Sequence, residues 1–403
     1  MNSYRNSDPR PPIMQGSPPL PHLRVPFDSW DRAPWNRWSF QHVRELLPTT
    51  EIWRGPGPAS PLTEVSQNLD DLSTTTLSGE TITLATLLDR TYTDGFVVLH
   101  RGRIVYERLY NGMQQRSLHL SQSMSKSVTG ALVGILAGQS VFTLDTAVAS
   151  ILPEFAATAY RDATLRHVLD MTSGVRFGED YTDPFSDVGK LDVASGWKRP
   201  PAPGPWPACV HDLALTLTEL ERPHGERFVY RSIETDILAF CIERATGARI
   251  APLVSELIWQ PMGAEENACF TVDPSGYALA CGGLNATLRD YLRFGAIYLN
   301  EGAFNGRQIV PADFVAQTRV ASGAVFGAPY TAVTPNGSYR NQFWIEDRAT
   351  GAIMARGVFG QLIHINPSAE TVVAKLSSLP DFINPTALAD TLAAIHAIGR
   401  ALR

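Results

Sequence analysis

Lysine is scarce in this sequence, because nearly all of its 34 basic residues are arginines. A motif that requires a lysine therefore has few chances to arise by accident. Lys126 begins a long apolar segment, whereas no other lysine does. The lysines are Lys126, Lys190, Lys198 and Lys375.

Cysteine is rare as well, and long apolar runs are missing. The cysteines form no C-x-x-C pair and have no adjacent histidine, which argues against a zinc site and favours free thiols in a reducing compartment. No apolar run approaches the roughly 20 residues that span a bilayer, and the proline-rich start contains no apolar signal segment. We therefore expect a cytoplasmic protein with no membrane partner. The cysteines are Cys209, Cys241, Cys269 and Cys281.

An excess of positive charge is absent too. The formal net charge of −6 and the pI near 5.9 provide no basic field for nucleic acid phosphates, so no nucleic acid partner is expected. A chain of 403 residues with 44% hydrophobic and 18% charged residues can bury a large core and is typical of a globular enzyme.

Strand patterns occur towards both ends of the chain, and helix patterns fill the middle. Residues 96–106, with Gly102 at the turn, and residues 361–376 are both typical of β-hairpins. This order favours an α+β fold with a central antiparallel sheet flanked by helices and an inserted, mostly helical region. Helical spacing is found at 126–139, 161–171, 234–245, 290–300 and 386–402, and a long Gly/Pro-rich loop at 174–207. The expected regions are an N-terminal arm packed on the core at 1–45, an α/β region at 46–155 plus 296–403, and a helical region at 156–295.

Ser123 and Lys126 are three residues apart at the start of the apolar segment 126–139. At a helix start this spacing places both side chains on one face, where they can meet. A serine hydroxyl is a poor nucleophile until a base takes its proton, and a lysine acts as that base only if its pKa falls well below about 10.4, as burial would cause. The free N–H groups of a helix start can also stabilise an oxyanion. The spacing therefore predicts a nucleophile at Ser123 and a base at Lys126.

The same S-x-x-K spacing recurs at Ser195 and Lys198. Lys198 is followed by Arg-Pro-Pro, and a residue ahead of such a run cannot begin a helix. We therefore interpret this second match as accidental.

The residues Ser-Met-Ser-Lys at 123–126, with the apolar helix after them, resemble the first motif of the serine β-lactamase and penicillin-binding-protein superfamily, as found in class C β-lactamases, DD-peptidases and related esterases. Within it the chain resembles most closely the 6-aminohexanoate-dimer hydrolases, which are amidases of nylon oligomers. The resemblance begins at about residue 28 and includes DSWDRAPWNRWSFQHV, TYTDGFVVL, SMSKSVTGALVG, EDYTDP, ASGW and VAKLSSLPD. It implies a β-lactamase-like fold, an acyl-enzyme on Ser123, and neither a cofactor nor a metal ion.

The resemblance also implies a tyrosine that relays protons to and from the nucleophile. Two literal Tyr-x-Asn matches in the second half of the chain begin at Tyr298 and Tyr339, both too late in the chain. Tyr230 precedes the expected helix 234–245, where the family places this tyrosine, and Ser232 stands where asparagine is usual. We therefore expect Tyr230 to be the proton relay and Ser232 to contact substrate.

The third family motif, usually Lys-Thr-Gly or His-x-Gly on a strand, has neither lysine nor histidine here. The residues in its place are Arg356-Gly-Val-Phe-Gly360. The resemblance implies that the N–H of Val358 joins that of Ser123 as the oxyanion hole, while Gly357 permits close approach to substrate. Arg356 is a candidate for the missing cation, which β-lactam enzymes use to hold a substrate carboxylate.

Two further substrate contacts are implied by the resemblance in the loop 178–192. Tyr181 corresponds to a tyrosine that contacts the scissile amide, and Asp192 falls where these enzymes can present a carboxylate to a substrate ammonium. A solvated surface position is the alternative for Asp192. The nine histidines show no metal-ligand spacing and no H-E-x-x-H motif occurs.

The expected function is a serine hydrolase that cleaves a small linear amide, like the 6-aminohexanoate dimer, or a short-chain carboxylic ester. A β-lactamase or DD-peptidase is disfavoured by the missing third-motif lysine. A non-catalytic descendant that binds peptides or scaffolds an assembly is a further alternative. The expected partner is a small-molecule amide or ester substrate, and the oligomeric state is left open, with a homodimer as one option.

Overall fold

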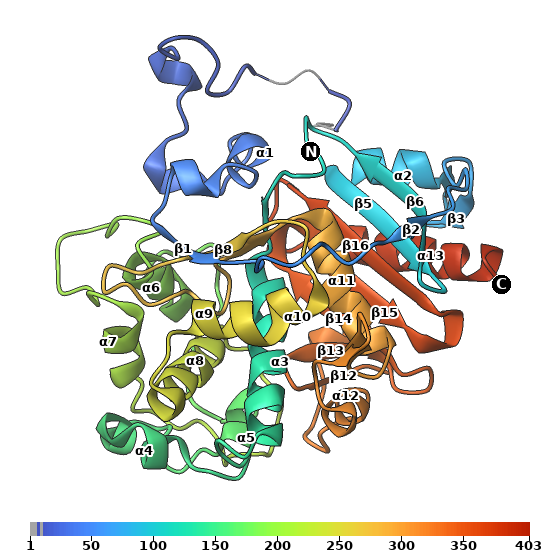
Figure 1. Cartoon of the computed structure of the whole chain (residues 1–403). Coiled ribbons are helices and arrows are strands. Elements are labelled where there is room, and N and C mark those ends of the chain that lie inside the picture. The colour runs from blue at the N-terminus through green and yellow to red at the C-terminus, as the bar shows by residue number, and fades with distance from the viewer. Residues whose placement is uncertain (1–5, 9–10) are drawn as a thin grey trace.

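The computed structural model describes residues 6–8 and 11–403. Its main sheet has eight strands in the order β12-β13-β14-β15-β16-β5-β6-β2, and every pair except β2 with β6 is antiparallel. The expected central antiparallel sheet flanked by helices is therefore confirmed (Figure 1). The strands are β2 (Thr63–Glu64), β5 (Thr93–His100), β6 (Arg103–Leu109), β12 (Ser338–Arg340), β13 (Phe343–Asp347), β14 (Ala352–Gly357), β15 (Gln361–Asn366) and β16 (Thr371–Ser377).

Both expected hairpins form, and each has a turn that its sequence supports. Arg101 and Gly102 between β5 and β6 both have positive φ, as in the two-residue turns that match strand twist. The turn between β15 and β16 is a short 3-10 segment, Pro367–Ala369. The side chain of Asn366, which precedes it, accepts a hydrogen bond from the Ala369 N–H. The two hairpins lie side by side because β16 pairs with β5, which places Thr371 opposite His100 and Ser377 opposite Thr93 in one sheet.

Helices cover both faces of the main sheet. On one face α11 (Leu288–Leu299) packs so closely that a Cβ at Gly295 would lie 2.5 Å from Val372. On the other face lie α2 (Leu84–Arg90) and α13 (Pro385–Ala401), with Ile395 and Ile398 in the same apolar cluster as sheet residues. The sheet is thus buried between two helical layers, as the apolar runs of its strands require.

The helices beside the sheet pack around α3 (Ser125–Gly138), from the expected α/β region, and α8 (Ile233–Thr246), from the expected helical region, and both are almost wholly buried. Two expectations here were wrong in part. Residues 161–171 form only α5 (Leu165–Leu169), and the loop 174–207 contains α6 (Asp187–Ala194), which begins where the Ser186 side chain accepts from Gly189 N–H. The other helices are α1 (Asn36–Ser39), α4 (Val148–Ile151), α7 (Val210–Leu215), α9 (Ile250–Val254), α10 (Gln260–Met262) and α12 (Ala312–Thr318).

A second sheet of four strands, ordered β1-β8-β9-β7, contains residues from both sides of the expected boundaries. Helix α11 likewise crosses the expected boundary between 295 and 296. The division into separate regions therefore stays a prediction. The strands are β1 (Thr49–Ile52), β7 (His119–Leu120), β8 (Ala268–Thr271) and β9 (Leu284–Ala286), and two further small pairs are β3 (Ser73–Thr75) with β4 (Thr81–Thr83) and β10 (Ala303–Phe304) with β11 (Arg307–Gln308).

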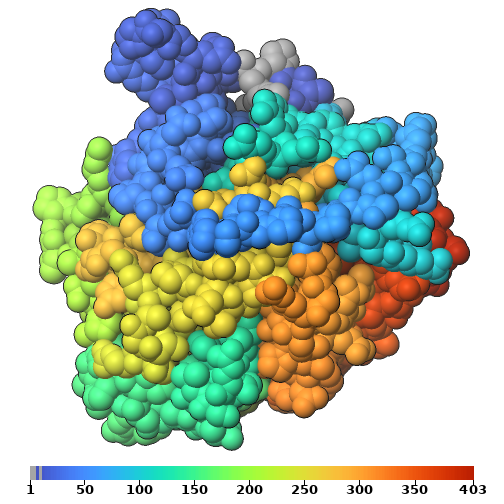
Figure 2. All heavy atoms as spheres, in the orientation of Figure 1, coloured from blue at the N-terminus to red at the C-terminus, as the bar shows by residue number. Residues whose placement is uncertain are grey.

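The described part of the N-terminal arm packs on the body of the protein. Trp30 is fully buried and its indole N–H donates to the carbonyl oxygen of Trp197 across 3.0 Å. Arg37 forms a buried ion pair with Asp94, and the Asn36 amide donates to the carbonyl of Leu379. Figure 2 shows the arm standing at one edge of the molecule, with the following residues as a blue band across one face. None of the helices among the described residues is both long and apolar enough to cross a membrane.

Candidate active site

Ser123 lies in a 3-10 turn, Gln122–Met124, that leads directly into α3. One helical turn later, the Lys126 amine donates to the Ser123 hydroxyl oxygen across 3.0 Å. Lys126 is only 2% exposed, whereas Ser123 is half-buried and lines a cavity. The predicted pair therefore meets at the boundary between the core and an accessible cavity.

A second hydrogen bond fixes the Lys126 amine, which donates to the carbonyl oxygen of Cys281 across 2.7 Å. The expectation of a lowered Lys126 pKa was wrong. Burial lowers the pKa of Lys126. The nearby acidic groups of Tyr230, Cys281 and Glu179 raise this pKa by more than burial lowers it, so the net pKa lies above its ordinary value. Lys126 is therefore a fixed cation in the resting site.

Tyr230 packs beside this cation, with the Lys126 nitrogen 5.2 Å from the centre of its ring. Its ring stacks on Trp344, and its backbone N–H donates to the Tyr330 hydroxyl across 3.0 Å. Burial raises the pKa of the Tyr230 phenol, while Lys126 and hydrogen bonding with Ser123 lower it by less. The phenol that faces the nucleophile is thus protonated at rest, and Lys126 stabilises its ionised form. The rejected matches Tyr298 and Tyr339 do not line the cavity.

Glu179 connects the other predicted substrate contacts. It accepts a 2.5 Å hydrogen bond from the Tyr181 hydroxyl and further bonds from the N–H and hydroxyl of Ser232. Burial raises the pKa of this carboxyl, although the Lys126 charge lowers it. Tyr181 lines the cavity as expected, whereas the Ser232 side chain is turned towards Glu179. Glu179 itself was missed, and its only signal was its place in the quoted segment EDYTDP.

The expected oxyanion donors lie in two strained turns. Ser123 follows Gln122, whose φ is +49°, and Val358 precedes Phe359, whose φ is +62°. Positive φ is costly for such residues and is often found where a backbone is shaped for function. Neither the Ser123 N–H nor the Val358 N–H has a backbone acceptor among the described residues.

Gly357 has a second role beside the one expected. It lines the cavity, but a Cβ there would also lie 2.5 Å from the carbonyl oxygen of Ser121. The end of β14 therefore approaches the nucleophile turn too closely for any side chain. This contact sets the distance between the two turns that carry Ser123 and Val358.

The cavity has a volume of about 350 Å³ and mostly apolar walls, among them Trp344, Leu362 and Phe382. Arg356 on β14 lies over the Trp344 ring at 4.5 Å and has no ion-pair or hydrogen-bond partner among the described residues. Burial lowers its pKa to about 10, so it is still a cation at neutral pH. Lys375 also lines the cavity but is 1% exposed and bonds to Ser377.

Asp192 does not line this cavity. On α6 its carboxylate lies 3.2 Å from the Lys198 amine, which also pairs with Asp31 at 2.9 Å. Burial raises the pKa of Asp192 to about 6, while Lys198 lowers it. Lys198 lies 5.8 Å from the ring of Phe382, a cavity residue, so this ion-paired group sits beside the cavity and is not simple solvated surface. Lys198 thus forms ion pairs with Asp31 and Asp192, which agrees with the interpretation of its S-x-x-K match as accidental.

Among the described residues, three side chains of types that can bind a metal ion, Glu346, His364 and His396, lie close together outside this cavity. The cavity and the residues against it offer the Ser123 hydroxyl, the Tyr230 phenol, the cations of Lys126 and Arg356, and the Glu179 carboxyl group. Such a set can carry out acyl transfer by acid–base and covalent catalysis.

Comparisons with known proteins agree with this chemistry. The family model described as Beta-lactamase matches residues 83–398. The chain is 35% identical over 358 residues to the 6-aminohexanoate-dimer hydrolase of Paenarthrobacter ureafaciens, covering 88% of each chain. It is 24% identical over 205 residues to Esterase EstB of Burkholderia gladioli, covering 45% of this chain and 48% of that one. A solved Bacillus anthracis structure, provisionally assigned as a 6-aminohexanoate-dimer hydrolase, superposes with a TM-score of 0.86 at 32% identity, covering 94% of this chain and 97% of that one.

Fold and comparisons together define an enzyme of the serine hydrolase superfamily with amidase or esterase chemistry. The chain belongs to the beta-lactamase family, in the branch that includes the 6-aminohexanoate-dimer hydrolases. The family resemblance stated from the sequence is confirmed.

Proposed function

We propose that Ser123 is the acylated nucleophile, with Tyr230 as proton carrier and Lys126 as the cation that supports both. The observation that carries this proposal is the 3.0 Å contact between the Lys126 amine and the Ser123 hydroxyl oxygen, at a site where Lys126 is sealed from solvent. A buried ammonium beside a hydroxyl and a phenol favours ionisation of either one.

The proposed reaction is a two-step acyl transfer. Ionised Tyr230 takes the Ser123 proton as the serine oxygen attacks an amide or ester carbonyl. The N–H groups of Ser123 and Val358 stabilise the oxyanion, and Tyr230 then gives its proton to the leaving amine or alcohol. Water releases the acyl group by the same steps in reverse roles. No step requires a cofactor or a metal ion.

The proposed substrate is a linear amide or ester that carries a carboxylate. Arg356 supports this, because a cation in an apolar cavity with no protein partner favours an anionic ligand. The 6-aminohexanoate dimer, which gives one relative its name, has a carboxylate at one end and an ammonium at the other. Asp192 is the proposed contact for an ammonium, although Lys198 already neutralises it. Tyr181 and Gly357 are proposed to flank the scissile bond, and Ser232 to hold Glu179 in place.

The test is labelling of the purified chain with a fluorophosphonate, followed by peptide mass spectrometry. An adduct on Ser123, absent in Ser123→Ala, is expected together with loss of p-nitrophenyl ester turnover. Ser195→Ala, which removes the serine of the second S-x-x-K match, is the matched control. It is expected to retain both the adduct on Ser123 and the p-nitrophenyl ester turnover. Equal turnover by Ser123→Ala and the natural chain would refute the assignment.

We further propose a cytoplasmic location and a small-molecule partner, not a nucleic acid or a membrane. The four cysteines, all free and buried, and the net charge of −6 support this. A homodimer stays a prediction.

A further inference from the structure

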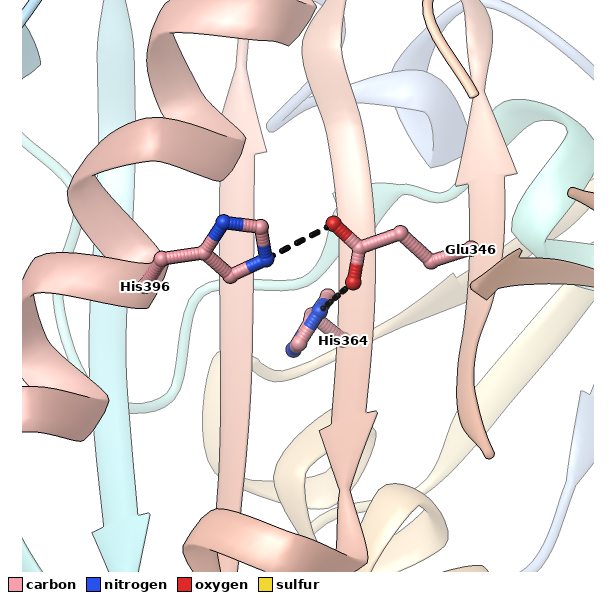
Figure 3. Close-up of side chains that lie close together, drawn as sticks. All are labelled: Glu346, His364 and His396. Carbon is pink, nitrogen blue, oxygen red and sulfur yellow. Dashed lines mark hydrogen bonds and ion pairs between the residues drawn. The ribbon is translucent and has the colours of Figure 1, made fainter. Parts of the chain in front are cut away.

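Glu346, His364 and His396 converge from three separate elements on the face of the main sheet that α13 covers (Figure 3). Glu346 is on β13, His364 on β15 and His396 on α13. The Nε2 atom of His364 lies 2.7 Å from one Glu346 oxygen, and that of His396 lies 2.8 Å from the other. Three potential ligand atoms therefore lie within 4.8 Å of one another.

The donor set suits a divalent transition metal ion. Two imidazole nitrogens and one carboxylate form a common three-ligand set for Zn²⁺, with water in the fourth position. Glu346 and His364 are buried, so two ligands are held by β13 and β15, the strands on either side of β14, while the half-exposed His396 is reached from solvent.

The surroundings supply access and room for a water ligand. Glu346 and His396 line a second cavity of about 650 Å³, in which Asn366 and Thr371 add polar groups and Arg400 adds a positive charge. His364 is fully buried, and its Nδ1 atom has no hydrogen-bond partner among the described residues. Because a metal-ligating histidine is usually held by a partner at its other nitrogen, this absence favours moderate affinity.

We propose that Glu346, His364 and His396 bind Zn²⁺ or a similar divalent transition metal ion, which fastens α13 to the main sheet. The consequence for the enzyme is indirect. Thr391 on α13 lines the catalytic cavity, and His396 lies little more than one turn further along the same helix. The ion stabilises one wall of the cavity and takes no part in catalysis. Neither Glu346 nor the two histidines show a sequence spacing that indicated this site.

The experiment uses the full chain without an affinity tag, treated with a chelator and then titrated with ZnCl₂ by calorimetry. We expect one ion per chain and a rise in melting temperature. Co²⁺ in place of Zn²⁺ is expected to give visible d–d absorption bands. His396→Gln is expected to weaken binding at least about 100-fold and to abolish the thermal shift, since second-shell losses alone cost 10- to 100-fold.

The matched control is His211→Gln, because His211 pairs with Glu154 at 3.4 Å but belongs to no group of three ligand-type side chains among the described residues. This variant is expected to bind Zn²⁺ as the natural chain does. Ester hydrolysis measured with chelator present reports independently on Ser123. Absence of one-to-one binding, or equal binding by the natural chain and His396→Gln, overturns the metal proposal and leaves the hydrolase proposal untouched.

Discussion

The Lys126 amine and the Cys281 carbonyl oxygen are joined by a 2.7 Å hydrogen bond across the interior of the active site. A carbonyl can only accept, so the amine must donate to it and its position is fixed. The same amine reaches Ser123 at 3.0 Å. Since its pKa is raised, we propose that Lys126 stays a cation and that Tyr230 transfers the proton.

Tyr230→Phe is expected to lower kcat by about 10²- to 10⁴-fold, the usual contribution of a general acid–base group. In the natural enzyme kcat/KM is expected to rise with pH through the alkaline range, because burial raises the pKa of the Tyr230 phenol and its ionised form is the base. Stopped-flow acylation by a p-nitrophenyl ester measures both.

Tyr298→Phe is the matched control for this substitution, since Tyr298 begins a literal Tyr-x-Asn match and is buried in α11 outside the cavity. It is expected to leave kcat unchanged. A flat pH profile shared by the natural enzyme and Tyr230→Phe would contradict the assignment of the proton carrier.

Arg356→Met is expected to lower kcat/KM for a carboxylate-bearing substrate by about 10- to 100-fold, the value of a charge-assisted hydrogen bond. Neutral substrates of equal length should be little affected. Two pairs measure this: p-nitrophenyl hydrogen glutarate with p-nitrophenyl valerate, and 6-acetoxyhexanoate with hexyl acetate. The pairs place the carboxylate in the acyl group or in the leaving group. An equal effect on charged and neutral members of both pairs would rule out a carboxylate contact.

Gly357→Ala is expected to lower kcat by about 10²-fold, as displacement of a catalytic group by about 1 Å can do. The reason is the 2.5 Å approach of its would-be Cβ to the Ser121 carbonyl oxygen, which forces the turn of Ser123 away from that of Val358. Gly57→Ala is the control, since a Cβ there meets no atom within 4 Å. Normal fluorophosphonate labelling kinetics in Gly357→Ala would be inconsistent with this geometry.

Lys375→Met is expected to stabilise the fold below neutral pH. Burial lowers the pKa of Lys375 to about 7, well below the value of about 10.4 expected in the unfolded chain. Between these two pH values the Lys375 amine is protonated in the unfolded chain but not in the folded one, so the free energy of unfolding of the natural chain rises with pH. The cost of burying the charged amine is therefore greatest below pH 7. The gain is expected to be on the order of 3 kcal/mol at pH 6 and to fade towards pH 10.

Urea unfolding at pH 6 to 10 measures this change. Lys190→Met is the matched control, because the Lys190 side chain is 41% exposed and pairs with Asp187 at the surface. A similar pH dependence of unfolding in the natural chain and Lys375→Met would exclude Lys375 as its source.

Local sequence was enough to predict the elements that carry the chemistry. Ser123 and Lys126 are close in the chain, and an i to i+3 spacing at a buried helix brings them together wherever that helix lies. The hairpins 96–106 and 361–376 and the helix before which Tyr230 lies were likewise set by short-range patterns. The sequence motif therefore determined the contact between Ser123 and Lys126 and the class of chemistry.

Tertiary structure alone decided the charge states of these residues and which side chains surround them. Whether Lys126 titrates as a base depends on Tyr230, Cys281 and Glu179, which lie from 53 to 155 positions away and meet it only in the folded chain. The same holds for Lys198, whose partner Asp31 comes from the N-terminal arm. A pKa is a property of the space around a group, and no spacing along the chain encodes that space.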